Sequence, residues 1–256
     1  MTNILTIYRK ELNSYFNSPI AYMVMALFGL LAGYFFYVYV AIFVDRSSQS
    51  QMMGGQSFPM DVNEWVIRQL LSNLSVIGLF MIPMLTMRLF AEEKRSGTIE
   101  LLTTSPVRDM EIILGKWLAA LTLYASVLAI SGFSVGTLFL YGNPDVAPIL
   151  TGYLGLLLQG GSLLAIGTFI STLTRNQIIA AFATFAVSLL LWVLDWVSAY
   201  ETAAWAKVIG YMSVITHFEP FAKGVIDSKD VIFYLSLIFF GLFMTARSME
   251  SLRWRA

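Results

Sequence analysis

The sequence predicts an all-α integral membrane protein with six transmembrane helices, on three observations. First, 57% of the 256 residues are hydrophobic and only 12% are charged, whereas globular domains are about 45–50% apolar and about 25% charged. Second, six stretches lack Asp, Glu, Lys and Arg, and they approach or exceed the ~20 residues that a helix needs to cross a bilayer. Third, these stretches are apolar all round, whereas the strands of a membrane barrel alternate apolar and polar residues.

The composition also excludes several classes of function. The 16 basic residues balance 16 acidic ones, so no overall positive field favours nucleic acid. Without cysteine there are no disulfides, thiolate metal sites or cysteine nucleophiles, and one histidine cannot build a polyhistidine metal site. No phosphate-binding loop, zinc-protease motif or serine–histidine arrangement is present. We therefore expect a non-enzyme with no catalytic residue, no metal site and no cofactor bound by this chain.

A single transmembrane domain is expected to fill residues 1–256. Ser18-Pro19 joins a capping residue to a proline at the first helical position and predicts the start of the first span. Asn143-Pro144 predicts a tight turn after the third span. The sixth charge-free run is short, and it needs Asp230 and Arg247 at its two interfaces. The predicted spans cover about 19–44, 69–88, 116–141, 147–173, 177–198 and 230–247.

The distribution of Lys and Arg predicts the direction of the spans. With the N-terminus in the cytoplasm, eleven of the 16 basic residues face inward and five outward, which is the positive-inside bias. Six spans then return the C-terminus to the cytoplasm. The inward group is Arg9, Lys10, Arg88, Lys94, Arg95, Arg108, Lys116, Arg175, Arg247, Arg253 and Arg255, and the outward group is Arg46, Arg68, Lys207, Lys223 and Lys229.

Residues 3–17 are too short and polar to cross a membrane. Apolar and aromatic side chains recur at three- and four-residue steps, and the cations lie elsewhere around the helix. This pattern predicts an amphipathic helix in the plane of the interface, with its apolar face toward acyl chains and its cations toward headgroups. A frayed polar leader is the alternative, which the helical spacing disfavours. The residues that define the in-plane helix are Ile4, Tyr8, Arg9, Lys10, Leu12 and Tyr15.

The loop between the second and third spans, residues 88–116, is much longer than the four to six residues of a simple connector. Gly97 predicts the end of a first helical piece, and Thr98 can cap a short second helix that runs through Thr103. Ser105-Pro106 predicts the start of a third helix, which leads into the third span.

The short middle helix of this loop combines apolar side chains with a charged rim. A solvated loop does not need the apolar side chains of Ile99, Leu101 and Leu102. An apolar tip inside a charged rim is typical of a protein docking site. The alternative is a helix packed back on the ends of its own spans, and spacing alone leaves the two open.

Two longer segments, 45–68 and 200–229, are expected on the outer side. Aromatic residues alternate with charges in the second, which favours short helices that dip into the interface. His217 lies in this segment and is interpreted as a hydrogen-bonded interfacial residue rather than a catalytic base. Asp195, flanked by Trp192 and Trp196, is placed at the headgroup boundary rather than inside the membrane.

The middles of the spans carry almost no charge. Ion-coupled transporters use ionisable groups or broken helices near the midplane. Work against a gradient would therefore need energy from another protein.

Residues 87–107 (MRLFAEEKRSGTIELLTTSPV), continued by 113–116 (ILGK), resemble the signature loop of exporter-type (type two) ABC transporter permeases. The chain is most similar to the gliding-motility-associated permease subunit group, which residues 8–11 (YRKE) and 224–227 (GVID) also fit. The similarity covers nearly the whole chain, and its central motif is long and specific. The name of the group is not an indication of gliding.

The resemblance implies six spans, an in-plane N-terminal helix, short external helices between spans five and six, and a cytoplasmic coupling helix that sits in a cleft of a separate ATP-binding subunit. Two permease chains would pair above two ATPases, the second chain being a copy or a related larger subunit, and ATP and magnesium would belong to the ATPases. The matching motif assigns the docking role to Glu92, Glu93, Lys94, Arg95, Gly97, Thr98, Ile99, Glu100, Leu101, Leu102 and Thr103. Among these we expect Ile99, Leu101 and Leu102 to fill an apolar groove, and Glu92, Glu93 and Arg95 to make rim contacts.

The expected function is that of the permease subunit of an ATP-binding cassette transporter in a bacterial inner membrane, which couples ATP hydrolysis in a separate subunit to substrate movement, with export as the expected direction. The alternative is a membrane subunit that transmits ATP-driven motion to periplasmic or cell-envelope partners without translocation. An intramembrane enzyme is disfavoured, because no convergent polar or metal-binding residues lie within the spans.

Overall fold

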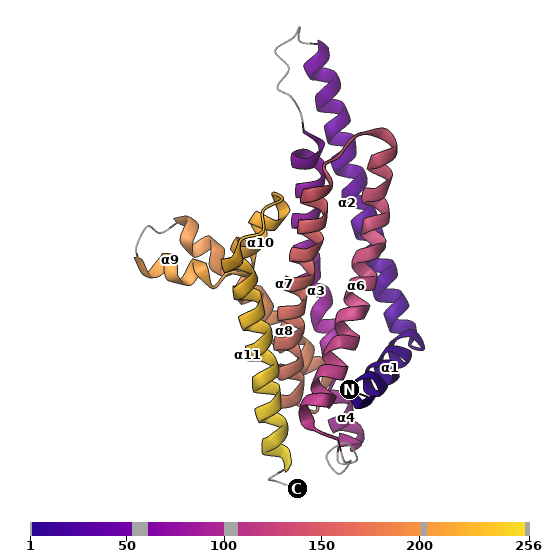
Figure 1. Ribbon diagram of the computed structural model, residues 1–256, viewed down its shortest axis with the longest axis vertical. Helices are drawn as coiled ribbons and strands as arrows, with labels where there is room; N and C mark the ends of the chain where they lie inside the picture. The colour runs from indigo at the N-terminus through magenta and orange to yellow at the C-terminus, as the bar shows by residue number, and fades with distance from the viewer. Residues whose placement is uncertain (1, 53–60, 100–106, 201–203, 254–256) are drawn as a thin grey trace.

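The computed structural model describes residues 2–52, 61–99, 107–200 and 204–253 (Figure 1). Within these ranges every regular element is a helix, which confirms the all-α class. The π-helical turn η1 runs directly into the third helix. The elements are α1 (Thr2–Phe16), α2 (Pro19–Met52), η1 (Asn63–Ile67), α3 (Arg68–Thr86), α4 (Ala91–Ser96), α6 (Asp109–Tyr141), α7 (Val146–Leu173), α8 (Gln177–Tyr200), α9 (Ala204–Tyr211), α10 (Val214–Ala222) and α11 (Ser228–Arg253).

Six of these helices, α2, α3, α6, α7, α8 and α11, are long and apolar enough to cross a membrane. This number confirms the six predicted spans, including the sixth, whose helix has 26 residues. α2 begins at Pro19, as predicted, but continues beyond residue 44 to Met52. Its 34 residues correspond to about 51 Å at 1.5 Å per residue, well beyond a hydrocarbon core of about 30 Å.

The glycine-rich helix α7 lies at the centre of the bundle, in contact with α3, α6, α8, α10 and α11. A Cβ atom at Gly160 would stand 2.1 Å from Cε1 of Tyr124 in α6, and one at Gly152 would stand 2.3 Å from Cδ1 of Leu71 in α3. Real Cβ atoms do not approach this closely, so the absence of side chains lets large neighbours pack against the α7 backbone. The glycines of the fourth span thus serve close packing.

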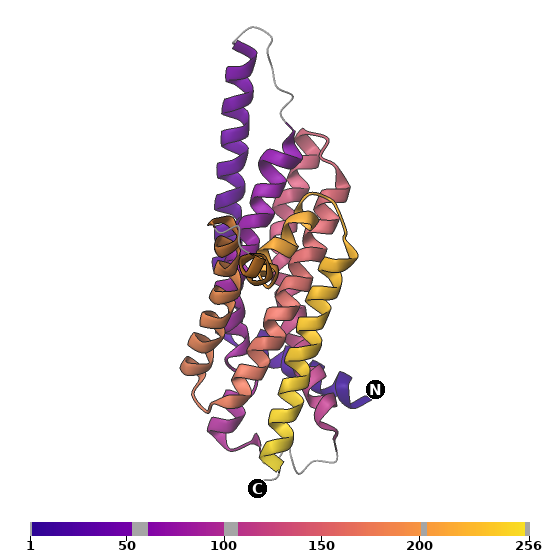
Figure 2. The ribbon, with the colours of Figure 1, turned by 90° about the vertical axis from the view of Figure 1, so that its left-hand side faces the viewer.

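Both ends of the chain lie at the same end of the bundle. Figure 1 shows α1, α4 and the last turns of α11 at this end, and the far end of α2 with the α6–α7 turn at the opposite one. The view in Figure 2 shows the same separation. An even number of crossings produces this arrangement.

Two short helices, α9 and α10, connect α8 to α11, where the sequence predicts short helices between the fifth and sixth spans. Figure 1 shows α9 projecting sideways from the bundle. α10 packs against α7, α3, α8 and α11. Ser213 caps α10, since its hydroxyl accepts a hydrogen bond from the backbone N–H of Ile215 at 3.3 Å.

The start of the third span differs from the prediction. We expected the helix to begin at Ser105-Pro106, but Val107 and Arg108 are not helical and α6 begins at Asp109. The carboxylate of Glu111 accepts a hydrogen bond from the backbone N–H of Arg108 at 3.2 Å. This hydrogen bond satisfies a donor just before the helix and helps to fix its start.

Asp230, which the sequence places at an interface of the sixth span, lies in the first turn of α11. Its side chain is 1% exposed and pairs with the buried His217 of α10.

Candidate functional site

The short helix α4 begins soon after α3 ends, and α7 holds its first turn. The Ser171 hydroxyl accepts hydrogen bonds from the backbone N–H groups of Phe90 and Ala91, at 3.1 and 3.0 Å. These donors belong to the helix start, which has no intrahelical partners for them, and both residues are buried. Gly97, with a φ of 73°, ends α4 in the left-handed conformation, as predicted. α4 is therefore fixed to the bundle at its first turn.

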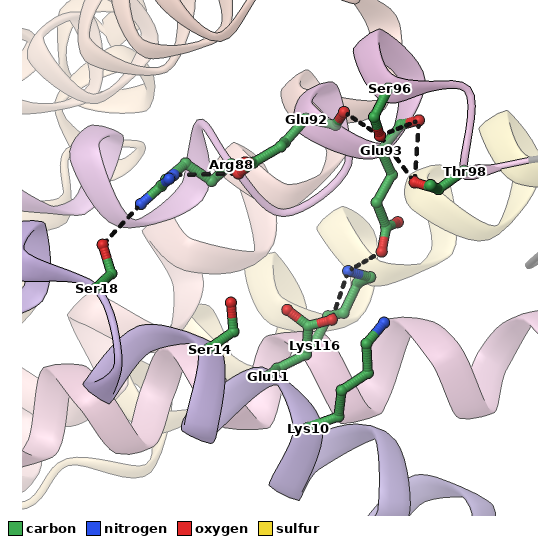
Figure 3. Close-up of a pocket in the computed structure, with 10 residues that line it drawn as sticks. All are labelled: Lys10, Glu11, Ser14, Ser18, Arg88, Glu92, Glu93, Ser96, Thr98 and Lys116. Carbon is green, nitrogen blue, oxygen red and sulfur yellow. Dashed lines mark hydrogen bonds and ion pairs between the residues drawn. The ribbon is translucent and has the colours of Figure 1, made fainter.

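A buried lysine joins α4 to two other helices (Figure 3). Lys116 of α6 is 2% exposed, and its Nζ lies 2.9 Å from Oε1 of Glu11 in α1 and 2.8 Å from Oε1 of Glu93 in α4. The same ammonium lies 5.3 Å from the centre of the Phe90 ring, which adds a cation–π contact. One side chain thus connects three separate helices by charge.

A second link runs along the same junction. Nε of Arg88 lies 3.1 Å from Oε2 of Glu92, and Nη1 of Arg88 donates a hydrogen bond to the Ser18 hydroxyl at 3.2 Å. The first turn of α4 is thereby connected to the end of α3 and the start of α2. Between the two links lies a cavity of about 430 Å³, whose lining carries three cationic and three anionic side chains (Figure 3). It is lined by Lys10, Glu11, Ser14, Ser18, Arg88, Glu92, Glu93, Ser96, Thr98 and Lys116.

The last turn of α7 makes a further contact with α4. Nζ of Lys94 donates a hydrogen bond to the backbone carbonyl of Thr172. Carbonyls in the last turn of a helix have no intrahelical partner, so a lysine ammonium is a favourable donor there. Together with Ser171, this contact attaches both turns of α4 to α7.

The N-terminal helix α1 lies across α6. The Tyr8 hydroxyl is 3.1 Å from the Thr122 hydroxyl, and the Tyr15 hydroxyl donates a hydrogen bond to the Leu85 carbonyl at 3.2 Å. Burial raises the pKa of the Tyr15 phenol well above its usual range, so the phenol keeps the proton that it donates. α1 is therefore anchored to both α6 and α3.

Part of the apolar face of α1 packs on protein, where the sequence analysis assigned it to acyl chains. Ile7 lies against Gly115 of α6, where a Cβ atom would stand 2.8 Å from Ile7 Cγ2. Leu5 and Phe16 remain exposed, at 49% and 38%. Among the predicted in-plane residues, Arg9 and Lys10 are exposed, whereas the half-buried ones are Ile4, Tyr8, Leu12 and Tyr15.

The sequence-predicted docking residues occupy different environments. Glu93 and Lys94 turn inward, where Glu93 pairs with Lys116 and Lys94 bonds to the Thr172 carbonyl. Ile99 is half-buried and packs against the core. The exposed members are Glu92, Arg95, Gly97 and Thr98. The other predicted docking residues lie outside the described residues and are Glu100, Leu101, Leu102 and Thr103. Most of the short helix expected at residues 98–103 also lies outside them.

The central residues of this junction could not be paired from the sequence. The sequence places Lys116 at the start of the third span and Glu11 in the motif at residues 8–11. They lie 105 positions apart, and no local spacing pairs residues at that distance. The role of Ser171 in capping α4 was not predictable from the sequence either, since serine is common in membrane helices. In the part of the chain that the structure describes, no group of three or more His, Cys, Asp or Glu side chains is placed to hold a metal ion.

Comparison with known proteins adds a family. The family described as "ABC-2 family transporter protein" matches residues 5–245. The chain is 26% identical over 168 residues to "Probable multidrug ABC transporter permease YbhR" of Escherichia coli K12, and equally to the protein of that name in Escherichia coli O157:H7. The matched region is 65% of this chain but only 44% of each relative, less than half of their length. The family match extends over nearly the whole bundle, and the chain belongs to the ABC-2 family of transporter proteins.

Proposed function

We propose that this chain is the permease subunit of an ABC transporter, which couples ATP hydrolysis in a separate subunit to the movement of a substrate, with export as its direction. The family match and the six candidate spans support this function. The relative in Escherichia coli, described as a probable multidrug ABC transporter permease, supports it further.

The observation that carries the proposal is the way α4 is attached. Its first turn is bonded to α7 through Ser171, and its Glu93 is bonded through Lys116 to α6 and α1. A force applied at α4 would therefore reach three helices through packed or bonded contacts, which is the physical requirement for coupling between distant sites.

The segment after α4 is the proposed docking site for the ATP-binding subunit. In this proposal Leu101 and Leu102 fill an apolar groove with Ile99 beside them, and the exposed Glu92 and Arg95 make rim contacts. Glu93 and Lys94 hold α4 in place instead of touching the partner. ATP and magnesium are bound by the partner and not by this chain.

The same proposal places the chain in a bacterial inner membrane with both termini in the cytoplasm and α1 in the plane of the inner interface. The exposed Arg9 and Lys10 would face headgroups there. A second permease chain, either a copy or a related larger subunit, completes the complex. Within the family we place the chain with the gliding-motility-associated permeases, on residues 8–11 and 224–227.

Co-purification with the ATP-binding subunit tests the docking site. Leu101→Asp and Leu102→Asp are each expected to weaken the complex by about 2 kcal/mol or more, because truncation or charge at a central anchor removes much of the binding energy. Glu92→Gln is the matched control at the rim, and it is expected to cost less than about 1 kcal/mol. Undiminished complex formation by both leucine variants would remove the docking assignment.

A second candidate function is transmission of ATP-driven motion to periplasmic or cell-envelope partners without translocation. The length of α2 favours it, since this helix continues to Met52 and is longer than a bilayer core requires. Reconstitution with the ATP-binding subunit into vesicles separates the two functions. ATP-dependent substrate accumulation supports transport, whereas ATP hydrolysis without accumulation of any tested substrate favours transmission.

A further inference from the structure

The chain has a single histidine, and it lies in a buried polar cluster between α10 and α11. His217 is 2% exposed, and its Nδ1 lies 2.6 Å from Oδ1 of Asp230, which is itself 1% exposed. The other ring nitrogen, Nε2, lies 2.8 Å from the backbone carbonyl oxygen of Tyr211. Both nitrogens of the imidazole therefore face oxygen atoms.

The two oxygens determine the protons on the ring. A backbone carbonyl only accepts hydrogen bonds, so Nε2 must carry a proton. Asp230 lies in the first turn of α11, where the helix dipole favours a carboxylate anion. With Asp230 as the anion, its oxygens only accept, and Nδ1 then carries a proton as well. An imidazole with protons on both nitrogens is a cation.

The surroundings of the ring suit a cation. Phe233 stacks on the imidazole, with ring centres 3.8 Å apart and planes 21° apart, and Tyr211 meets it edge-on at 4.8 Å. An aromatic face attracts a cation placed over it. Tyr234, 6.4 Å away, gives its hydroxyl hydrogen to the Val214 carbonyl at 2.7 Å and not to the imidazole.

The other charged groups near α10 are bonded elsewhere. Asp195 of α8 accepts a hydrogen bond from the Thr216 hydroxyl at 2.9 Å. Glu219 pairs with Arg68 of α3 at 2.9 Å and with Lys223 at 2.6 Å. Lys229, the neighbour of Asp230 in the chain, also feels the Asp230 carboxylate, but its ammonium is bonded to Asp227 at 3.0 Å.

We propose that His217 and Asp230 form a proton-binding latch: an imidazolium–carboxylate pair that holds α10 on the first turn of α11 and loosens when the proton leaves. Loss of the Nδ1 proton would set a lone pair against the carboxylate. Oδ2 of Asp230 already has no hydrogen-bond partner among the described residues. The carboxylate would then be buried without compensation, which is strongly unfavourable.

The single histidine gives the test a direct readout. The chain is labelled with ¹⁵N-histidine and studied in lipid nanodiscs at neutral pH. The latch predicts that both imidazole nitrogens resonate as protonated. One protonated and one bare nitrogen would show a neutral ring beside a protonated Asp230, and that result would overturn the proposal.

Two aspartate variants complete the test. Asp230→Asn removes the carboxylate, so the ring is expected to be neutral at the same pH. Asp227→Asn is the matched control, because the Asp227 side chain is 42% exposed and pairs with Lys229 rather than with His217, and it should leave the histidine spectrum unchanged. An identical spectrum in all three proteins would contradict the pairing.

Hydrogen exchange measures the latching itself. Amide exchange in residues 214–222 is expected to rise at least about tenfold in Asp230→Asn relative to Asp227→Asn. In the unmodified chain, exchange corrected for its intrinsic pH dependence is expected to rise as His217 loses its proton. If α10 stays equally protected in all states, the pair is not a latch.

Discussion

Lys116 is the side chain whose removal should disturb this molecule most. Its ammonium is buried and is paired with two glutamates that are themselves largely buried. Replacing one partner in a buried charge cluster typically costs about 3–5 kcal/mol, because the remaining charges lose their compensation. The two carboxylates would also repel each other across the gap.

We therefore expect Lys116→Met to lower the free energy of unfolding by about 3 kcal/mol or more, measured by thermal denaturation of the purified protein in detergent. Lys229→Met is the control, since Lys229 is 59% exposed and pairs with Asp227 at the surface. Its effect should stay within about 0.5 kcal/mol. Adding Glu11→Gln and Glu93→Gln to Lys116→Met should recover part of the loss. Equal melting temperatures for the two lysine variants would contradict the central role of Lys116.

At the scale of elements, α4 is a helix of six residues that is too short to be stable by itself. It persists because of two contacts with α7. The Ser171 hydroxyl of α7 accepts the free N–H groups at the start of α4. The Lys94 ammonium of α4 donates to a carbonyl in the last turn of α7. The stability of α4 therefore resides in its neighbours rather than in its own sequence.

Ser171→Ala tests this dependence. The variant leaves the N–H groups of Phe90 and Ala91 buried without a partner, at a cost of about 1–3 kcal/mol. Amide exchange in residues 90–96 should accelerate by a corresponding factor. Ser251→Ala is the control, because the exposed Ser251 hydroxyl donates a hydrogen bond to the Ser248 carbonyl within its own helix. Unchanged protection of α4 in Ser171→Ala would show that its cap is dispensable.

At the scale of the whole molecule, the geometry and the charge pattern make one joint prediction about orientation. The ends of the chain and α4 share one end of the bundle (Figure 1), and the basic residues predict that this end is cytoplasmic.

The chain lacks cysteine, so single cysteines can be introduced without any background. We expect Ser96→Cys and Ser251→Cys to react with an impermeant maleimide only after right-side-out vesicles are opened. Tyr141→Cys, at a position 91% exposed near the opposite end, should react in sealed vesicles. The reverse pattern would refute the topology.

The fold was largely predictable from the sequence because it depends on local properties. Long apolar runs fix the spans, and Ser18-Pro19 and Gly97 mark helix ends through their own backbone preferences. The junction and the buried Asp230 were not predictable, because each depends on a partner that only folding brings near. Lys116 pairs with Glu11, which is 105 positions away in the sequence. His217 of α10 pairs with Asp230 of α11.

The length of α2 has a mechanical consequence. α1 and α2 are joined by only Asn17 and Ser18, whose N–H groups donate hydrogen bonds back to the carbonyls of Asn13 and Tyr15. About 20 Å of α2 exceeds the bilayer core. A rotation of α1, whose Glu11 is bonded to Lys116, would therefore be passed through this short connection to a helix that extends well beyond the membrane.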